Sequence, residues 1–305
     1  MLPMDRLRVL SASVLVPVSI FFAYIGGPFY VLFTAVVVFL AAREYVQLFQ
    51  RRDFRPSMPL VVGGALVFVV GAYLTSQRGH ELLRWYTGYD LGSWRNWAYN
   101  GTLILLLAAM TWHVVDHERG APYTASDWAF TIAGAMYLGI FAAHSVLLRE
   151  DLGLSGRWAV LVVLPVQWVA DSAAMMVGRR YGRHKLAPRL SPGKTWEGYL
   201  AGVIGGTLAG IVFGAIASAL ASPGFGIEPA GADIRVNWLT GLIVGLLCGV
   251  FTPLGDLGES LFKRQAHVKD SGNLVPGHGG VLDRTDSQLW ASVIAYYFFA
   301  FFVGR

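Results

Sequence analysis

The stretch from 256 to 286 holds the residues best suited to chemistry. It reads DLGESLFKRQAHVKDSGNLVPGHGGVLDRTD and separates two long apolar segments. Its 31 residues include five carboxylates, four basic residues, two histidines and five glycines. In a chain that is 55% hydrophobic, this charge density indicates a site that handles a charged substrate. The alternative at this point is an ordinary solvated loop between two membrane segments.

The spacing within this stretch favours a metal site. On a continuous helix Asp256, Ser260 and Lys263 recur at i, i+4 and i+7, and therefore share one face. Asp283 and Asp286, three residues apart, share a face where the last apolar segment begins. Two carboxylates from separate helix ends suit Mg²⁺, which completes its shell with water and substrate phosphates. A zinc site is not expected, because the sequence has no pair of cysteines and no HExxH motif.

A second polar stretch runs from 167 to 197. Asp171 lies inside or at the end of an apolar segment, where a carboxylate is costly unless it is paired or lines a cavity. Five basic residues follow it, and the sequence SPGKT at 191–195 then leads into the next apolar segment. Small and hydroxyl residues with a lysine before a helix suit phosphate groups, although the Walker A spacing is absent. The arginines taken alone are better explained by membrane topology.

The elements that must position these residues are membrane helices. Mean hydropathy is +0.51, only 14% of residues are charged, and apolar runs near 20 residues recur along the chain. Backbone amides in lipid must be satisfied internally, so these runs should be helical. We predict an all-α polytopic membrane protein, a single integral membrane domain over residues 1–305. The predicted spans are 9–25, 29–49, 58–75, 97–115, 128–148, 158–177, 196–221, 236–255 and 287–303.

Basic residues set the predicted orientation. With the N-terminus inside, the cytoplasmic segments hold 16 of the 24 Lys and Arg residues. The positive-inside rule then predicts an N-in, C-out bundle whose polar loops 178–195 and 256–286 are both cytoplasmic and form the active site. This topology also explains the net charge of +5 without nucleic-acid binding. Glycines spaced for close packing recur in spans seven and eight, which should therefore approach closely.

Fixed residue types recur at fixed spacing in both polar stretches. One block is Ser260-Leu-Phe-Lys263-Arg264, four residues, Lys269-Asp270, then Pro276-Gly-His278-Gly-Gly, Leu282-Asp283-Arg284 and Asp286. The other is Asp171 with Ser191-Pro-Gly-Lys194-Thr195-Trp-Glu197. These blocks, about a fifth of the chain, resemble the signature of the phosphatidate cytidylyltransferases, or CDP-diacylglycerol synthases. Val275 departs from the Ile, Leu or Phe more usual in that family, which leaves the chemistry untouched.

The resemblance implies that CTP and phosphatidic acid react to give CDP-diacylglycerol and pyrophosphate, at the cell (inner) membrane, in phospholipid biosynthesis. It implies Asp256 and Asp283 as ligands of Mg²⁺, and it leaves a second, monovalent cation open. The implied catalytic residues are Lys263, Arg264, Lys269, His278, Arg284 and Asp286. The implied substrate-binding residues are Asp171, Ser191, Lys194, Thr195, Glu197 and Ser260.

Two other functions remain open on sequence grounds. A related enzyme acting on a different lipid phosphate, such as that of a polyprenol, would carry the same head-group site. A transporter would place charges along the span axes or show inverted repeats, whereas the charges here gather at one predicted membrane face. The expected partners are CTP, phosphatidic acid and membrane lipid, with no nucleic acid. A homodimer is one alternative for the oligomeric state, which the sequence does not give.

Overall fold

The computed structural model describes residues 4–225, 227–229, 234–275 and 279–303, and it is almost entirely helical. The chain divides into two compact units. The first comprises Met1–Glu150 with Phe262–Thr285, and the second Asp151–Leu261 with Asp286–Arg305. Helices α10 (Pro253–Gln265) and α11 (Leu282–Phe298) each contribute residues to both units.

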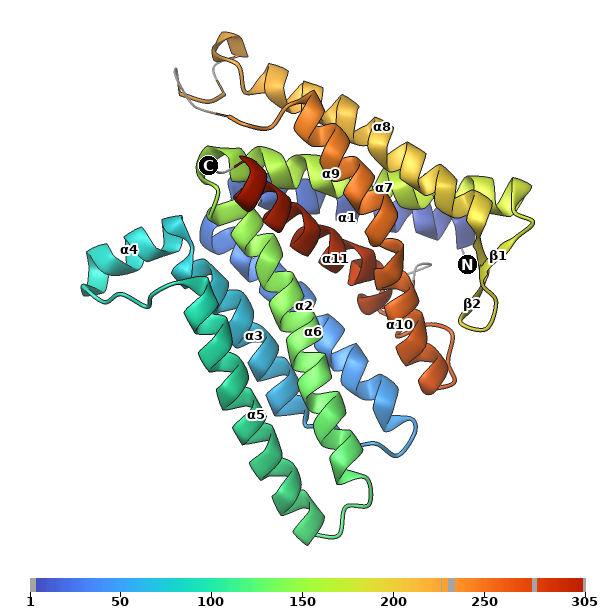
Figure 1. Ribbon diagram of the computed structural model, residues 1–305. Helices are drawn as coiled ribbons and strands as arrows, with labels where there is room; N and C mark the ends of the chain where they lie inside the picture. The colour runs from blue at the N-terminus through green and yellow to red at the C-terminus, as the bar shows by residue number, and fades with distance from the viewer. Residues whose placement is uncertain (1–3, 226, 230–233, 276–278, 304–305) are drawn as a thin grey trace. The chain divides into compact units, whose positions relative to one another are not determined.

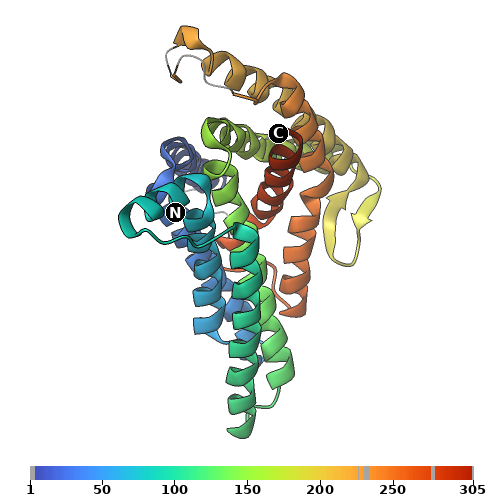
Figure 2. The same cartoon turned by 60° about the vertical axis from the view of Figure 1, so that its left-hand side comes forward.

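The first unit is built around α3. Its helices are α1 (Met4–Ile25), α2 (Gly27–Gln50), α3 (Met58–Thr75), α4 (Gln77–Thr87), α5 (Trp94–Glu118) and α6 (Thr124–Glu150). Helix α3 packs against α2, α5 and α6, and these four run alongside one another, with the short α4 at the end of α3 (Figure 1 and Figure 2). Helix α4 ends at Gly88, whose backbone is left-handed (φ 72°). Because α2, α3 and α6 also contact one another in pairs, they form the centre of this unit.

A two-glycine turn joins α1 to α2. Gly26 and Gly27 both have positive φ, 69° and 59°, which side chains with a Cβ adopt only with strain. Arg149 Nε donates to the Ala23 carbonyl over 2.6 Å, and Glu150 Oε1 accepts from Gly27 N–H over 2.5 Å. A Cβ on Gly26 would meet the Arg149 guanidinium. The end of α6 therefore satisfies backbone groups that the turn leaves exposed.

Aromatic rings fix the segment 262–285 within the first unit. The ring of Phe262 packs edge-on against Tyr45 of α2, with centroids 5.5 Å apart. Phe49 stacks on Phe130 of α6 at 4.0 Å, and the Tyr45 hydroxyl donates to the Phe130 carbonyl over 3.1 Å. Tyr45 and Phe49 are fully buried. The last turn of α10 is thus anchored to α2 by apolar contact.

Close packing of glycines organises the second unit. Its elements are α7 (Gly153–Tyr181), β1 (Lys185–Ala187), β2 (Ser191–Thr195), α8 (Trp196–Leu220), α9 (Trp238–Phe251), 253–261 of α10 and 286–298 of α11. A Cβ on Gly210 would meet the Gly241 carbonyl, and one on Gly245 would meet the Gly206 carbonyl. Helices α8 and α9 therefore approach through their glycines, as the sequence predicts.

A β-hairpin interrupts the predicted all-helical fold. Strands β1 and β2 are antiparallel, with Lys185 opposite Thr195 and Ala187 opposite Ser191. Pro188, Pro192 and the glycine at 193 disfavour a helix here. Thr195 Oγ1 then accepts from Gly198 N–H over 3.2 Å and caps the N-terminus of α8. The SPGKT motif is therefore a strand that runs directly into a helix.

Seven helical segments of the described chain are long and apolar enough to cross a membrane. They are α2, α3, α5, α6, α7, α8 and the consecutive stretch Trp238–Gln265. These correspond to the second to eighth predicted spans. The first predicted span falls on a shorter apolar helix, Ser11–Ile25 within α1. The last predicted span falls on the 17 residues of α11. The chain is a multi-pass helical membrane protein.

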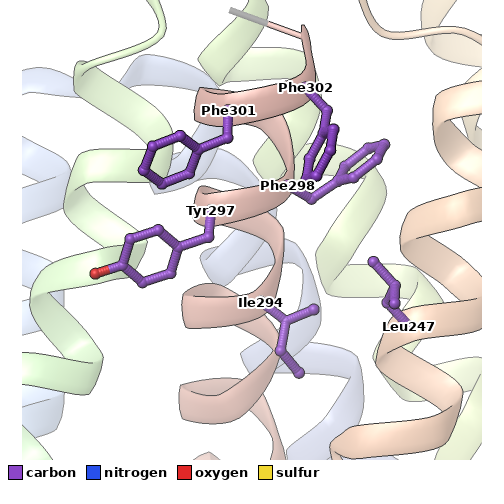
Figure 3. Close-up of a pocket in the computed structure, with 6 residues that line it drawn as sticks. All are labelled: Leu247, Ile294, Tyr297, Phe298, Phe301 and Phe302. Carbon is purple, nitrogen blue, oxygen red and sulfur yellow. The ribbon is translucent and has the colours of Figure 1, made fainter.

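An apolar groove of about 600 Å³ lies beside α11 in the second unit. It is lined by Leu247, Ile294, Tyr297, Phe298, Phe301 and Phe302. Figure 3 shows the rings of Tyr297 and Phe301 on one side of the helix and those of Phe298 and Phe302 on the other. Each pair is stacked, with centroids 5.8 and 6.1 Å apart. Tyr297, Phe301 and Phe302 are exposed, and exposed aromatic rings of this kind suit contact with lipid.

Candidate active site

Three carboxylates gather in the second unit. Asp256 and Glu259 of α10 and Asp286 of α11 each offer an oxygen, and these oxygens all lie within 4.8 Å of one another. Asp256 and Glu259 are three residues apart and so share a helix face. Glu259 and Asp286 are 1% and 7% exposed. A Cβ on Gly255 would lie 2.7 Å from the Asp286 carbonyl, so the glycine permits the close approach of α11.

This arrangement requires positive charge. Like charges at such short separation repel, and burial strengthens the repulsion. Lys194 Nζ lies 2.6 Å from Asp256 Oδ2, and Ser260 Oγ donates weakly to Asp256 Oδ1 over 3.4 Å. The ammonium of Lys194 offsets part of this negative charge. Hard oxygen donors in this number fit a divalent cation of the Mg²⁺ type, whose remaining positions water and phosphate oxygens can fill.

The ion pair between Lys194 and Asp256 also joins the two polar stretches of the sequence. Lys194 stands on β2, directly before the N-terminus of α8, and Asp256 stands in the first turn of α10. The side chain of Lys194 is 22% exposed and that of Asp256 is 40% exposed. A partly exposed lysine beside a helix N-terminus is suited to phosphate oxygens. The hairpin therefore brings the ammonium of Lys194 to the carboxylate cluster.

The other residues of the SPGKT block have local structural contacts. Glu197 accepts from the His184 N–H over 3.2 Å and contacts His184 Nδ1 at 2.6 Å, which fixes the base of the hairpin. Asp171 is exposed on α7, and its Oδ1 accepts from Gln167 Nε2 over 2.9 Å. Ser191 is half-buried at the start of β2. These contacts place Glu197 as a support for the hairpin that carries Lys194.

Asp283 is the centre of a separate polar cluster in the first unit. Its Oδ1 accepts from Lys263 Nζ over 2.6 Å. Its Oδ2 accepts from Ser271 N–H, Ser271 Oγ and Gly280 N–H, each over 2.9 Å. Asp283 is 8% exposed. Several donors around one carboxylate stabilise its charged form and fix its orientation.

Two carboxylates near these clusters are absent from the sequence-predicted site. Glu44 of α2 accepts from Leu282 N–H over 2.9 Å and from Ser271 Oγ over 3.2 Å, and it is 7% exposed. An ionisable residue inside an apolar span was the signal that could have singled it out. The position of Glu259, three residues after Asp256 and on the same helix face, could have identified it as a site residue.

The predicted metal ligands fall in different units. Asp256 belongs to the second unit, where its acidic neighbours are Glu259 and Asp286, and Asp283 belongs to the first. The assignment of Asp283 as a metal ligand stays a prediction.

Three basic residues of the signature are exposed. They are Arg264, Lys269 and Arg284. Arg264 Nη1 donates to the Val268 carbonyl over 3.2 Å. Exposed cations of this kind suit contact with phosphates. His278 lies outside the described residues.

Sequence comparison decides the family. Residues 6–302 match the model of the cytidylyltransferase family. The chain belongs to this family. The resemblance predicted from the two motif blocks is confirmed, and the similarity extends far beyond them.

Individual cytidylyltransferases match over nearly their whole length. The phosphatidate cytidylyltransferase of Haemophilus influenzae is 32% identical over 314 residues, which cover 98% of this chain and 100% of the relative. The enzyme of the same name from Brucella suis is 32% identical over 295 residues, with 97% and 93% coverage. That of Synechocystis sp. is 29% identical over 321 residues, with 97% and 96% coverage. The two units of this cytidylyltransferase are therefore both within the shared region.

Proposed function

We propose that the chain is a phosphatidate cytidylyltransferase, which converts CTP and phosphatidic acid to CDP-diacylglycerol and pyrophosphate. The observation that carries the proposal is the end-to-end similarity to enzymes of that name. An oxygen of the lipid phosphate forms a bond to the α-phosphorus of CTP. The bond from that phosphorus to the oxygen bridging to the β-phosphate breaks, and pyrophosphate leaves. Because the lipid phosphate is already an anion, no serine or cysteine nucleophile is required.

The carboxylate cluster supports a metal-assisted reaction. Asp256, Glu259 and Asp286 would hold Mg²⁺, and their close spacing is the supporting observation. Bound there, Mg²⁺ would neutralise phosphate charge and orient the leaving group. Lys194, beside Asp256, supplies a fixed cation for a phosphate oxygen of CTP.

Further cations of the signature belong to the first unit. Asp283 holds the ammonium of Lys263 in place through a 2.6 Å contact, so Lys263 needs little reorganisation to meet a phosphate. Arg264, Lys269 and Arg284 are exposed and can follow the substrate phosphates by side-chain movement. We assign these residues to holding the triphosphate and the leaving pyrophosphate. Catalysis then consists of positioning and charge neutralisation, as in other phosphoryl-transfer reactions.

We further propose nine spans in an N-in, C-out orientation, with the active site on the cytoplasmic side of the inner membrane. Seven segments already meet the length and apolarity that crossing requires. Helix α1 and helix α11 with its C-terminal extension would supply the first and last spans. The excess of Lys and Arg in loops 50–57, 178–195 and 256–286 supports this orientation. The same side holds the soluble nucleotide CTP.

Purified protein with labelled CTP tests the function. Phosphatidic acid should give labelled CDP-diacylglycerol and an equal amount of pyrophosphate, and the reaction should require added Mg²⁺. Glu259→Gln should raise the Mg²⁺ concentration needed for half-maximal rate about tenfold or more, the loss expected for one ligand worth ~1.4 kcal/mol. No product with phosphatidic acid, together with turnover of a polyprenyl phosphate, would establish the related lipid phosphotransfer reaction instead.

A further inference from the structure

Glu44 is a buried carboxylate inside a membrane-spanning helix. It lies in α2, a segment long and apolar enough to cross a membrane, and it is 7% exposed. A carboxylate in such a place is costly unless other groups satisfy it. Neither polar stretch of the sequence contains it. Its contacts within the first unit therefore show what it does.

One oxygen of Glu44 contacts two donor groups of the signature segment. Oε2 accepts from the backbone N–H of Leu282 over 2.9 Å, and it lies 3.2 Å from Ser271 Oγ, whose single hydrogen it shares with Asp283 Oδ2. Leu282 is the first residue of α11 and is fully buried, so its N–H has no intrahelical acceptor and no water. Glu44 thus caps the N-terminus of α11 from a different helix, across 238 residues of sequence.

The same contacts reach the pair that the proposed chemistry uses. The Ser271 hydroxyl that touches Glu44 also touches Asp283 Oδ2 at 2.9 Å, and Ser271 N–H donates to that same oxygen. Asp283 in turn holds Lys263 Nζ through its other oxygen. The order of contacts is therefore Glu44, Ser271, Asp283 and Lys263. Helix α2 fixes the orientation of the Asp283–Lys263 pair through this series.

Two glycines make the approach of Glu44 possible. A Cβ on Gly280 would collide with Glu44 Oε2 and Ser271 Oγ, and a Cβ on Gly272 would lie 2.5 Å from Glu44 Oε1. The absence of a Cβ at Gly272 and Gly280 therefore leaves room for the carboxylate of Glu44.

We propose that Glu44 is a positioning residue of the cytidylyltransfer reaction, acting by accepting hydrogen bonds from Leu282 and Ser271. This inference rests on the proposed function. It requires an acceptor oxygen at the position of Oε2 and does not require the negative charge. A glutamine can supply that oxygen and keep both bonds. A methionine has a similar volume and supplies neither.

The test compares Glu44→Gln with Glu44→Met in the full chain. Leaving the buried Leu282 N–H without its acceptor costs ~1–3 kcal/mol, less than the ~5–15 kcal/mol stability of a typical domain, so both variants should be recovered folded. Glu44→Met should lower kcat about 30-fold, equivalent to ~2 kcal/mol, and change KM for CTP less than about twofold, because only the orientation of Lys263 is lost. Glu44→Gln should keep kcat within about threefold of wild type, or ~0.7 kcal/mol.

The matched control is Glu150, a buried carboxylate of the same unit. It is 2% exposed and accepts from the Gly27 backbone, far along the chain from the signature segment. Glu150→Met should lower the thermal midpoint and leave kcat of the folded fraction unchanged. If Glu44→Met and Glu150→Met lower kcat equally, or if Glu44→Gln is as slow as Glu44→Met, the positioning role is wrong.

Hydrogen–deuterium exchange separates this inference from the proposed function. Glu44→Met should speed exchange of peptides from 268–275 and 279–285, and Glu150→Met should not. The same difference in exchange is expected even if wild-type protein makes no CDP-diacylglycerol. In that case the proposed function is wrong, while the contacts from Glu44 through Ser271 and Asp283 to Lys263 remain supported. If Glu44→Met does not fold, Ser271→Ala provides the second variant: it should lower kcat about tenfold, or ~1.4 kcal/mol. Wild-type kcat in Ser271→Ala would overturn the inference.

Discussion

Replacing Asp283 by asparagine separates the structural and chemical roles of this carboxylate. Asparagine can place its carbonyl oxygen where Oδ2 accepts from Ser271 and Gly280. In the wild-type protein the other carboxylate oxygen accepts from Lys263 Nζ over 2.6 Å. In the variant the side-chain amide N–H₂ faces this ammonium instead, so two donors oppose each other. Asp283 is 5% exposed in its side chain and Lys263 12%, so solvent screens the lost attraction only weakly.

The expected cost follows from that geometry. Breaking one side of a buried ion pair costs ~3–5 kcal/mol, against a total stability of ~5–15 kcal/mol for a typical domain. Asp283→Asn should therefore fold with a clearly lowered thermal midpoint. The rate of CDP-diacylglycerol formation per folded molecule should fall at least about a hundredfold, or ~2.7 kcal/mol, because Lys263 loses its orientation.

The double variant Asp283→Asn with Lys263→Met is the control. Removing the ammonium relieves the donor–donor conflict, so part of the lost stability should return while the rate stays low. Rates are measured with labelled CTP at saturating lipid and Mg²⁺, and folding by thermal unfolding in the same detergent. If Asp283→Asn alone keeps more than about a tenth of the wild-type rate, a loss under ~1.4 kcal/mol, then Asp283 neither holds a metal nor orients Lys263.

Three further outcomes are expected. Lys194→Arg should preserve membrane orientation yet lower kcat/KM for CTP about tenfold, or ~1.4 kcal/mol. The control Lys185→Arg should leave kcat/KM unchanged. Equal effects of the two substitutions would mean that both lysines only set the membrane topology. Gly245→Val should lower the thermal midpoint, because the Cβ of the valine would meet a backbone carbonyl of α8. The expected loss of stability is ~1–3 kcal/mol. An unchanged midpoint would contradict the close packing of α8 and α9. Cysteines introduced at Arg183 and Gln265 should react with a membrane-impermeant reagent only in inverted vesicles, and labelling from the outside would contradict the orientation and the function together.

The helices were predictable because lipid restricts the backbone so strongly. A run of about 20 apolar residues has few alternatives to a helix, and the seven central spans are found near their predicted positions. Glycine spacing also predicted the approach of α8 and α9. The hairpin at 185–195 was not predicted, because strands of three and five residues carry too short a pattern to detect. The sequence SPGKT was interpreted as a phosphate-binding loop before a helix.

The candidate site was predictable in its residue types and less so in its partners. The sequence singled out both Asp256 and Asp286 as site residues. The structure brings their oxygens close together, on helices that the sequence could locate. Glu44 could not be assigned, because its partners Ser271 and Leu282 lie 227 and 238 residues away. No local pattern encodes such a contact. The division of Asp256 and Asp283 between units is likewise a property of the tertiary fold.

The turn at Gly26 and Gly27 determines where this chain can accept added sequence. Its two left-handed residues, with the side chains of Arg149 and Glu150 packed against them, leave no space for an inserted tag. The connection that follows α4 differs, since Gly88 has open space around it and Tyr89 is 74% exposed. Insertions are tolerated at exposed loop tips. We expect an epitope or a fluorescent domain to be accepted at 89–91, where it would report on which side of the membrane this loop lies in living cells.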